Sequence, residues 1–154
     1  MFIRPLTEGD IPTCAQIVTT APVWQRYGLT IERATQQFSE ALRTNAPVLV
    51  ADDGNGNVIG FVRLILRGAF DLSPYIRWLA VASTQRSRGV GRQLLSGAEA
   101  LVQPPVRDMF LLCADFNTDA QRFYESNGYS RIGTIPDYVI PGVTEYIYRK
   151  RLIP

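Results

Sequence analysis

The sequence predicts a single α/β (α+β) domain with a mixed, mostly antiparallel, twisted sheet of about seven strands and about four flanking helices. The 154 residues are enough for one compact domain and too few for two ordinary ones. Apolar residues make up 46% of the chain and charged residues 19%, as in folded globular proteins. Strand-like and helix-like patterns alternate along residues 1–154 without repeats, low-complexity tracts or a linker.

The first third of the chain predicts one strand followed by two helices. Residues 2–4 form a short opening strand, and apolar residues at helical spacing follow Thr7 or Asp10, either of which can cap the first helix. Residues 21–29 are expected to form a loop. Thr30 is a good N-cap for the second helix.

The middle of the chain predicts three strands. Residues 48–51 and 58–66 are apolar runs separated by a turn-rich segment at 52–57, which indicates an antiparallel hairpin. Residues 68–74 are expected to form a loop, and the apolar run at 76–81 forms the next strand.

The second half of the chain begins with a helix that Gln103-Pro104-Pro105 stops. Residues 108–114 then form an apolar strand, and Asn117 can cap a short helix. Gly128 follows that helix at a position where a left-handed conformation commonly ends it. Two closing strands are expected at residues 129–135 and 143–149.

The most informative segment is a glycine-rich turn between a strand and a helix, with the sequence Arg86-Ser87-Arg88-Gly89-Val90-Gly91-Arg92. A strand, a glycine turn and a helix in this order point free backbone N–H groups at an anion. Three arginines lie around the glycines, and guanidinium groups bind phosphate well. The segment therefore predicts a phosphate-bearing, nucleotide-type ligand.

Composition excludes several kinds of site. The chain has no histidine, which removes Ser-His-Asp and Cys-His nucleophilic sites and the usual base near neutral pH. Cys14 and Cys113 are too far apart in the sequence to form a metal-type pair, so we expect no metal and two small apolar side chains in a reducing compartment. A formal net charge of only +2 argues against nucleic-acid binding.

The N-terminal segment does not resemble a signal peptide, and no apolar run reaches the ~18 residues of a membrane span. We therefore expect a cytoplasmic protein that does not bind membranes.

Two motifs resemble those of the GNAT N-acetyltransferase superfamily. Leu79-Ala80-Val81 followed by Arg86-x-x-Gly89-x-Gly91 is similar to its acetyl-coenzyme-A motif. The later stretch from Asn117 to Tyr129, with alanine three residues after the asparagine, then Phe-Tyr and Gly-Tyr, resembles its second motif. The expected order of strands and helices also matches, so the resemblance covers nearly the whole chain.

The resemblance implies an acetyl-coenzyme-A (acetyl-CoA) site. The residues from Arg86 to Arg92 would bind the pyrophosphate, and the strands ending at Val81 and Ala114 would splay around the pantetheine arm. Backbone groups near Leu79 and Val81 would bond to that arm, and an amide there could also hold the developing oxyanion. The family's asparagine, here Asn117, would contact the arm as well as cap its helix.

Tyr124 occupies the family's general-acid position. A phenol has a pKa of ~10 and a thiol one of ~8.5, so complete proton transfer to the departing thiolate is uphill by roughly 2 kcal/mol. We therefore interpret Tyr124 first as a hydrogen-bond donor to sulfur. Tyr75 lies near the place where many family members have a glutamate, and it is the second candidate catalytic residue.

The general base is open in the sequence, because residues 74–78 contain no carboxylate. Deprotonating a lysine-like amine at pH 7 costs ~4.6 kcal/mol, and deprotonating an α-amine costs ~1.4 kcal/mol. A weakly basic amine could lose its proton to water. A stronger one would need Asp71, Glu32 or a water held by backbone carbonyls.

The acceptor site is expected between three connections, at residues 21–29, 70–74 and 136–141. Asp71 and Asp137 could attract a cationic amine there. Aromatic side chains are expected to line the site, namely Trp24, Tyr27, Phe70, Tyr75 and Tyr138.

These observations predict acetyl transfer from acetyl-CoA to a primary amine by direct attack in a ternary complex. The acceptor would be a small-molecule amine or a protein N-terminus, and the resemblance suggests a homodimer. One alternative is a non-catalytic acyl-CoA-binding regulatory module on the same fold. A Rossmann dinucleotide site is another, with Gly89, Gly91 and Asp115 at suggestive spacing, but Leu94 replaces its third glycine.

Overall fold

A computed structural model describes residues 1–153. The longest helix has 13 residues, and none of the helices in this range has the length and apolar character needed to cross a membrane. In chain order the elements are β1 (Phe2–Pro5), a 3-10 turn η1 (Glu8–Asp10), α1 (Ile11–Thr20), α2 (Pro22–Arg26), α3 (Ile31–Arg43), β2 (Val48–Asp52), β3 (Val58–Ala69), β4 (Ser73–Val81), a 3-10 turn η2 (Ser83–Gln85), α4 (Val90–Ala100), β5 (Asp108–Ala114), α5 (Thr118–Ser126), β6 (Ser130–Pro136) and β7 (Thr144–Arg151).

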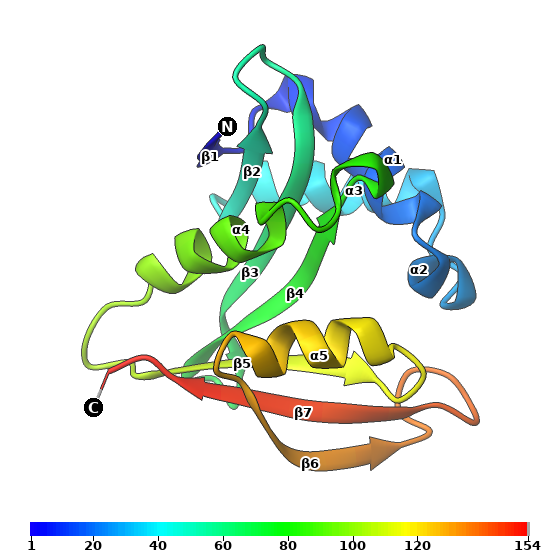
Figure 1. Cartoon of the computed structure of the whole chain (residues 1–154), viewed down its shortest axis with the longest axis vertical. Coiled ribbons are helices and arrows are strands. Elements are labelled where there is room, and N and C mark those ends of the chain that lie inside the picture. The colour runs from blue at the N-terminus through cyan, green and yellow to red at the C-terminus, as the bar shows by residue number, and fades with distance from the viewer. Residues whose placement is uncertain (154) are drawn as a thin grey trace.

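The seven strands form one sheet in the order β1-β2-β3-β4-β5-β7-β6 (Figure 1). Neighbouring strands are antiparallel except for β4 and β5, which form the one parallel pair among residues 1–153. The mixed, mostly antiparallel sheet predicted from the sequence is confirmed. A Rossmann domain, whose sheet is mostly parallel, is excluded.

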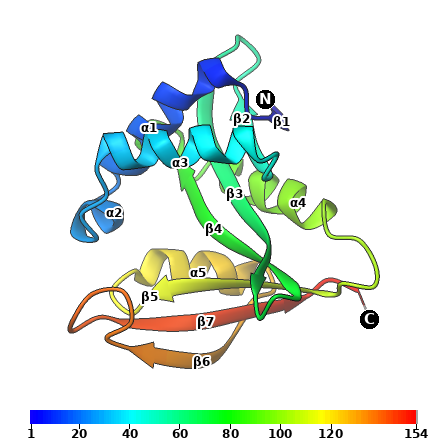
Figure 2. The same cartoon turned by 180° about the vertical axis from the view of Figure 1, so that it is seen from behind.

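The sheet parts between β4 and β5. These strands pair only where Tyr75 faces Phe110 and Ile76 faces Leu111. Beyond these two pairs the strands diverge toward their C-terminal ends, and β5 continues alongside β7 in the lower half of the molecule (Figures 1 and 2). The expected splay of the strands ending at Val81 and Ala114 is confirmed.

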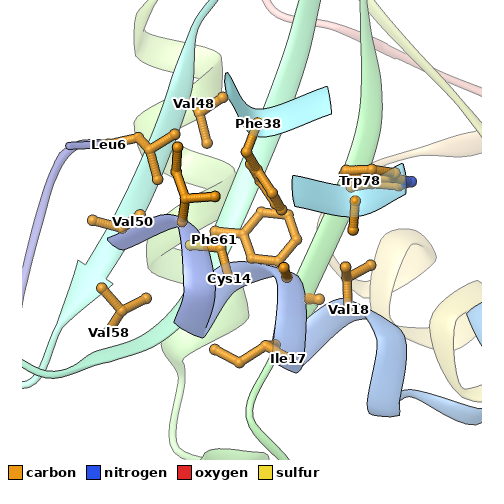
Figure 3. Close-up of a cluster of buried hydrophobic side chains, with 14 of the residues drawn as sticks. Leu6, Cys14, Ile17, Val18, Phe38, Val48, Val50, Val58, Phe61 and Trp78 are labelled. Carbon is orange, nitrogen blue, oxygen red and sulfur yellow. The ribbon is translucent and has the colours of Figure 1, made fainter. Parts of the chain in front are cut away.

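Two apolar cores lie on opposite faces of the sheet. Helices α1 and α3 cover one face of β2, β3 and β4, while α4 and α5 share the other (Figures 1 and 2). The first core is centred on Phe38, Phe61 and Trp78, whose ring centroids lie 4.9–6.4 Å apart (Figure 3). The second contains Leu94 and Tyr148, both fully buried.

Local signals placed most helix ends correctly. Thr30 caps α3 by accepting a hydrogen bond from the backbone N–H of Arg33 at 3.2 Å. Asn117 caps α5 through the N–H of Ala120 at 3.4 Å. Gly128 takes a φ of +90° just after α5, in the left-handed region that glycine tolerates.

Two segments expected to be loops are more regular than predicted. Residues 21–29 contain the one-turn helix α2, so residues 1–153 contain five α-helices, where about four were expected. Pro22 begins that helix, because its fixed φ suits the first helical position. The expected loop at 68–74 is a three-residue turn at 70–72, since β3 and β4 extend further than their apolar runs.

Candidate active site

A cavity of about 810 Å³ opens where β4 and β5 separate. It is walled by the two strands, by α2, α3 and α5, by β7 and by the connection that follows β6. The structure thus brings together residues from distant parts of the chain that the sequence analysis selected, namely Trp24, Tyr27, Phe70, Tyr75, Leu79, Asn117, Tyr124 and Tyr138.

A β-bulge in β4 shapes the wall of this cavity. Arg63 pairs with Trp78 and Leu64 pairs with Ile76, so Arg77 is an extra residue in β4. The bulge interrupts the usual alternation of faces. As a result Trp78 packs in the core under α1 and α3, whereas Ile76 belongs to the core on the opposite face.

Tyr124, on α5, is a buried residue of the cavity lining. The rings of Phe123, Tyr129 and Tyr148 surround it at centroid distances of 5.2, 5.8 and 6.3 Å. Burial raises the pKa of the Tyr124 phenol, and the nearby Cys113 and other groups add to this effect. The phenol therefore keeps its proton and can donate a hydrogen bond into the cavity.

Glu145, on β7, is the one carboxylate among the cavity-lining residues that the structure describes. Its side chain is buried, with the residue 4% exposed, and it accepts a hydrogen bond from the Tyr27 hydroxyl. Burial raises the pKa of Glu145, the Tyr27 hydrogen bond opposes this rise, and the charge of Asp115 adds to it. A carboxylate with a raised pKa is a stronger base than a free one, which suits it to accept a proton.

The sequence analysis did not select Glu145, although the strand pattern contains a signal for it. Val143, Glu145 and Ile147 alternate along one face of the last strand, and Val143 is buried. A carboxylate at an inward position of a strand is unusual, because burying a charge is costly without a partner. Period-two alternation therefore marks Glu145 as an unusual inward carboxylate, but only the fold shows that it lines the cavity.

The three acidic residues considered earlier lie outside the cavity lining. Asp71 is exposed on the β3–β4 turn, where Arg67 binds its carboxylate at 2.9 Å. Asp137 accepts a hydrogen bond from the backbone N–H of Gly142 at 2.6 Å. Glu32 is exposed in the first turn of α3, where the helix dipole favours it.

Tyr75 and Cys113, which also line the cavity, have raised pKa values. Burial raises the pKa of the Tyr75 phenol; Arg77 opposes this rise, whereas Glu145 and Tyr138 add to it. Burial also raises the pKa of the Cys113 thiol to about 12. Cys113 therefore stays protonated at neutral pH and is a poor nucleophile.

The glycine-rich turn leads into the N-terminus of α4. Gly89 is the N-cap, with a φ of +80°, and no side chain caps this end. The first intrahelical hydrogen bond runs from the N–H of Gln93 to the carbonyl of Gly89. The N–H groups of residues 90–92 therefore have no partner within the helix.

The two glycines serve different purposes. A Cβ on Gly89 would meet no atom within 4 Å, so the space beside it is open and its positive φ is what requires glycine. A Cβ on Gly91 would lie 3.2 Å from the ring of Phe123 and 3.8 Å from Val81. Gly91 thus lets the start of α4 approach both α5 and the end of β4.

The arginines of this turn, Arg86, Arg88 and Arg92, are exposed and form no ion pair within residues 1–153. Residues 86–92 do not line the cavity itself, and neither does Val81. Residues 86–92 lie beyond the end of β4, so the exposed arginines are outside the buried cavity.

Residues 1–153 form one domain with a split, mixed sheet. The family model of the acetyltransferase (GNAT) domain matches residues 44–131, more than half of the chain. The chain belongs to the GNAT acetyltransferase family, as the resemblance in its motifs predicted. The comparison with curated protein sequences finds no match.

Solved structures share this fold across almost their whole length. The ribosomal-protein-alanine N-acetyltransferase of Brucella melitensis is 24% identical with a TM-score of 0.79, covering 99% of this chain and 100% of that one. An aminoglycoside 6′-N-acetyltransferase in complex with coenzyme A is 16% identical with a TM-score of 0.80, covering 100% and 98%. The yncA protein of Salmonella typhimurium, with acetyl-CoA, is 19% identical with a TM-score of 0.79, covering 100% and 95%.

Proposed function

We propose that residues 1–154 form a single acyl-CoA-dependent N-acyltransferase domain, which transfers an acetyl group from acetyl-CoA to a primary amine in a ternary complex. One observation carries this proposal. Tyr124 and Glu145, both buried, line the same cavity at the place where the sheet of a GNAT fold separates. Structural neighbours in complex with coenzyme A and with acetyl-CoA support the choice of donor.

The residues at the turn fit the diphosphate of acetyl-CoA. Free N–H groups at residues 90–92 and the open space beside Gly89 allow a phosphate to approach the backbone closely. Ser87 has a φ of +63°, and successive N–H groups in such a turn form an anion-binding concavity. Arg86, Arg88 and Arg92 would add charge-assisted hydrogen bonds.

The unpaired edge of β4 suits the pantetheine arm. Past Ile76 this strand has no partner on its β5 side, so backbone groups at Leu79 and Val81 are free to bind the amides of the arm. Asn117 lines the cavity opposite, at the start of α5. Acetyl-CoA supplies an acetyl thioester whose carbonyl carbon is the electrophile.

Glu145 acts as the general base in this proposal. It takes the proton of the acceptor ammonium, and the nitrogen then forms its bond to the acetyl carbon while the carbon–sulfur bond breaks. The hydrogen bond from Tyr27 holds the carboxylate in place. Tyr75, Trp24 and Tyr138 surround the reacting amine with aromatic surface.

Tyr124 stabilises the departing thiolate by donating its hydroxyl hydrogen bond to the sulfur. Its raised pKa keeps the proton on the phenol and makes complete transfer to the thiolate unfavourable. The sulfur therefore receives its proton after the bond has broken, from solvent or from the second N–H that the nitrogen loses as it becomes an amide. The phenol keeps its own proton, and Glu145 passes the first proton to solvent.

Calorimetry and a thiol-release assay test the proposal. The protein should bind acetyl-CoA and ignore NAD, and Arg86→Gln should weaken binding by about tenfold, the loss of one charge-assisted contact. Arg43→Gln is the matched control, because Arg43 is an exposed arginine paired with Glu40 on α3. Release of coenzyme A should depend on an added amine. Tight binding without release for any amine would identify a regulatory module instead.

A further inference from the structure

We propose that the amine acceptor also carries a carboxylate or a comparable oxyanion, as a free amino acid does, and that Arg33, Gln37 and Arg77 bind this anionic group. The inference rests on the proposed function and names the substrate class of that site. It follows from the charges, the unpaired donors and the aromatic supports on the α3 side of the cavity.

The cavity has positively charged side chains on one side and a carboxylate on another. Arg33 and Gln37 on α3 and Arg77 on β4 line it on one side, and the buried carboxylate of Glu145 lines it on another. The phenol of Tyr75 is within the electrostatic influence of both Arg77 and Glu145. A small zwitterion could thus place its amine at Glu145 and its anionic group at the arginines.

The arginines on this side have no acidic partner in the protein. Arg33, Arg63 and Arg77 are in none of the eight ion pairs among residues 1–153. Arg63 donates to the side-chain oxygen of Gln37 at 2.7 Å. Burial, followed by repulsion from Arg77, lowers the pKa of Arg63. An anion in the cavity would relieve the unfavourable concentration of positive charge.

Two buried donors near these arginines are without an acceptor. Within the described residues, the Nε atom of Arg63 and the Nε1 atom of Trp78 are buried and lack any hydrogen-bond partner. Trp78 lines the cavity although it is only 1% exposed, and its nitrogen is at the end of the ring away from Phe38 and Phe61 (Figure 3). An unsatisfied buried donor is costly, so a ligand oxygen at this place would be favoured.

Aromatic rings hold the guanidinium groups in position. The Cζ atoms of Arg63 and Arg77 both lie 5.2 Å from the ring centroid of Trp78, and that of Arg77 lies 5.8 Å from Trp24. The bulge in β4 makes this possible, because it adds Arg77 beside Trp78. A guanidinium oriented by aromatic faces is prepared for two-point binding of a carboxylate.

The test uses matched acceptors, the common L-amino acids and their carboxamides, in the thiol-release assay. At least one amino acid should exceed its carboxamide in kcat/KM by about tenfold or more, the value of a charge-assisted hydrogen bond. The carboxamide is the weaker base and loses its proton more readily, so this preference runs against intrinsic reactivity. A short peptide with a free N-terminus should be a poor acceptor.

Variants then locate the anion site. Arg77→Gln should abolish the preference by lowering kcat/KM about tenfold more for the acid than for the carboxamide. Arg33→Gln, on the exposed surface of α3, should reduce the preference even if Arg77→Gln fails to fold. Arg43→Gln on the same helix is the control and should keep the preference.

Failure of this inference is distinguishable from failure of the proposed function. If carboxamides or peptides are acetylated as fast as the acids, the anion site is wrong. The proposed acetyl transfer is unaffected by that result. If no amine is acetylated, the proposed function fails, and calorimetry of the same acid and carboxamide pairs with the wild-type protein decides on the anion site. Equal or absent binding of the two would then overturn it.

Discussion

The hydroxyl of Tyr27 donates a hydrogen bond to the buried carboxylate of Glu145, a residue 118 positions further along the chain. Tyr27 directly follows α2, and Glu145 lies on β7, so this contact connects the N-terminal helices to the C-terminal half of the sheet across the cavity. It fixes the position of the only carboxylate that the described cavity lining contains and limits how far burial raises its pKa.

Tyr27→Phe should move the acid limb of the kcat/KM profile to higher pH. The hydrogen bond from Tyr27 lowers the pKa of Glu145, so its removal leaves burial and Asp115 to raise that pKa further. Because the base works only when deprotonated, activity should be lost at a higher pH than in the wild type and recover as the pH rises. Tyr146→Phe, on β7 itself, is the control. An acid limb that stays in place would remove Glu145 from the role of base.

Tyr124→Phe should lower kcat by about 100-fold, the typical contribution of a positioned proton donor. The affinity for acetyl-CoA, measured by calorimetry, should change little, because the hydroxyl interacts with the sulfur only as it departs. Tyr129→Phe is a matched control, since its ring packs against Tyr124 but its hydroxyl bonds to Glu99 at 3.1 Å. An unchanged kcat in Tyr124→Phe would show that the thiolate leaves without this phenol.

Gly68→Ala should disturb the site through Tyr75. An added Cβ would lie 2.7 Å from the Cβ of Tyr75 and 2.9 Å from the Cβ of Ile65, neither of which is the free end of a flexible side chain. We expect a loss of about 1–3 kcal/mol in the free energy of unfolding and a fall in kcat. Gly9→Ala is the control, because the nearest atom to its Cβ would be 4.0 Å away. Wild-type stability and activity in Gly68→Ala would contradict this close packing.

Asp10→Asn should destabilise the N-terminal half of the fold in a pH-dependent way. The hydrogen bonds from Arg4, at 2.7 and 3.0 Å, and from Thr7 lower the pKa of Asp10 from 3.8 to about 2. A carboxyl whose pKa is lowered by folding stabilises the native state above its unfolded pKa and loses that effect as the pH falls toward 2.

Urea unfolding of the wild type and of Asp10→Asn measures this effect. The two proteins should differ by about 2 kcal/mol near neutral pH, and the difference should shrink between about pH 4 and pH 2. A difference that is the same at all pH values would mean that the ion pair with Arg4 contributes no net stability.

Local sequence signals were sufficient for much of the fold. The cap at Thr30 and the left-handed Gly128 each depend on one or two neighbouring residues, so sequence alone locates them. The one-turn helix α2 was missed because a single turn gives too little periodicity to detect.

Non-local features of the site were beyond these signals. Ile76 and Trp78 are two residues apart and by alternation should share a face, yet the bulge at Arg77 puts them on opposite faces. A bulge leaves no mark in composition, since it depends on the register with β3. Glu145 became a candidate base only when the fold brought β7 to the cavity.

The parting of β4 from β5 gives the sheet four edges in place of two. The outer edges, β1 and β6, resemble those of any open sheet. The inner edges face one another across a gap too wide for strand pairing and bounded by helices on both sides. Under the proposed function, these unpaired backbone groups bind the amides of the donor's arm. This arrangement exposes hydrogen-bonding backbone inside the molecule without the aggregation risk that an exposed edge carries.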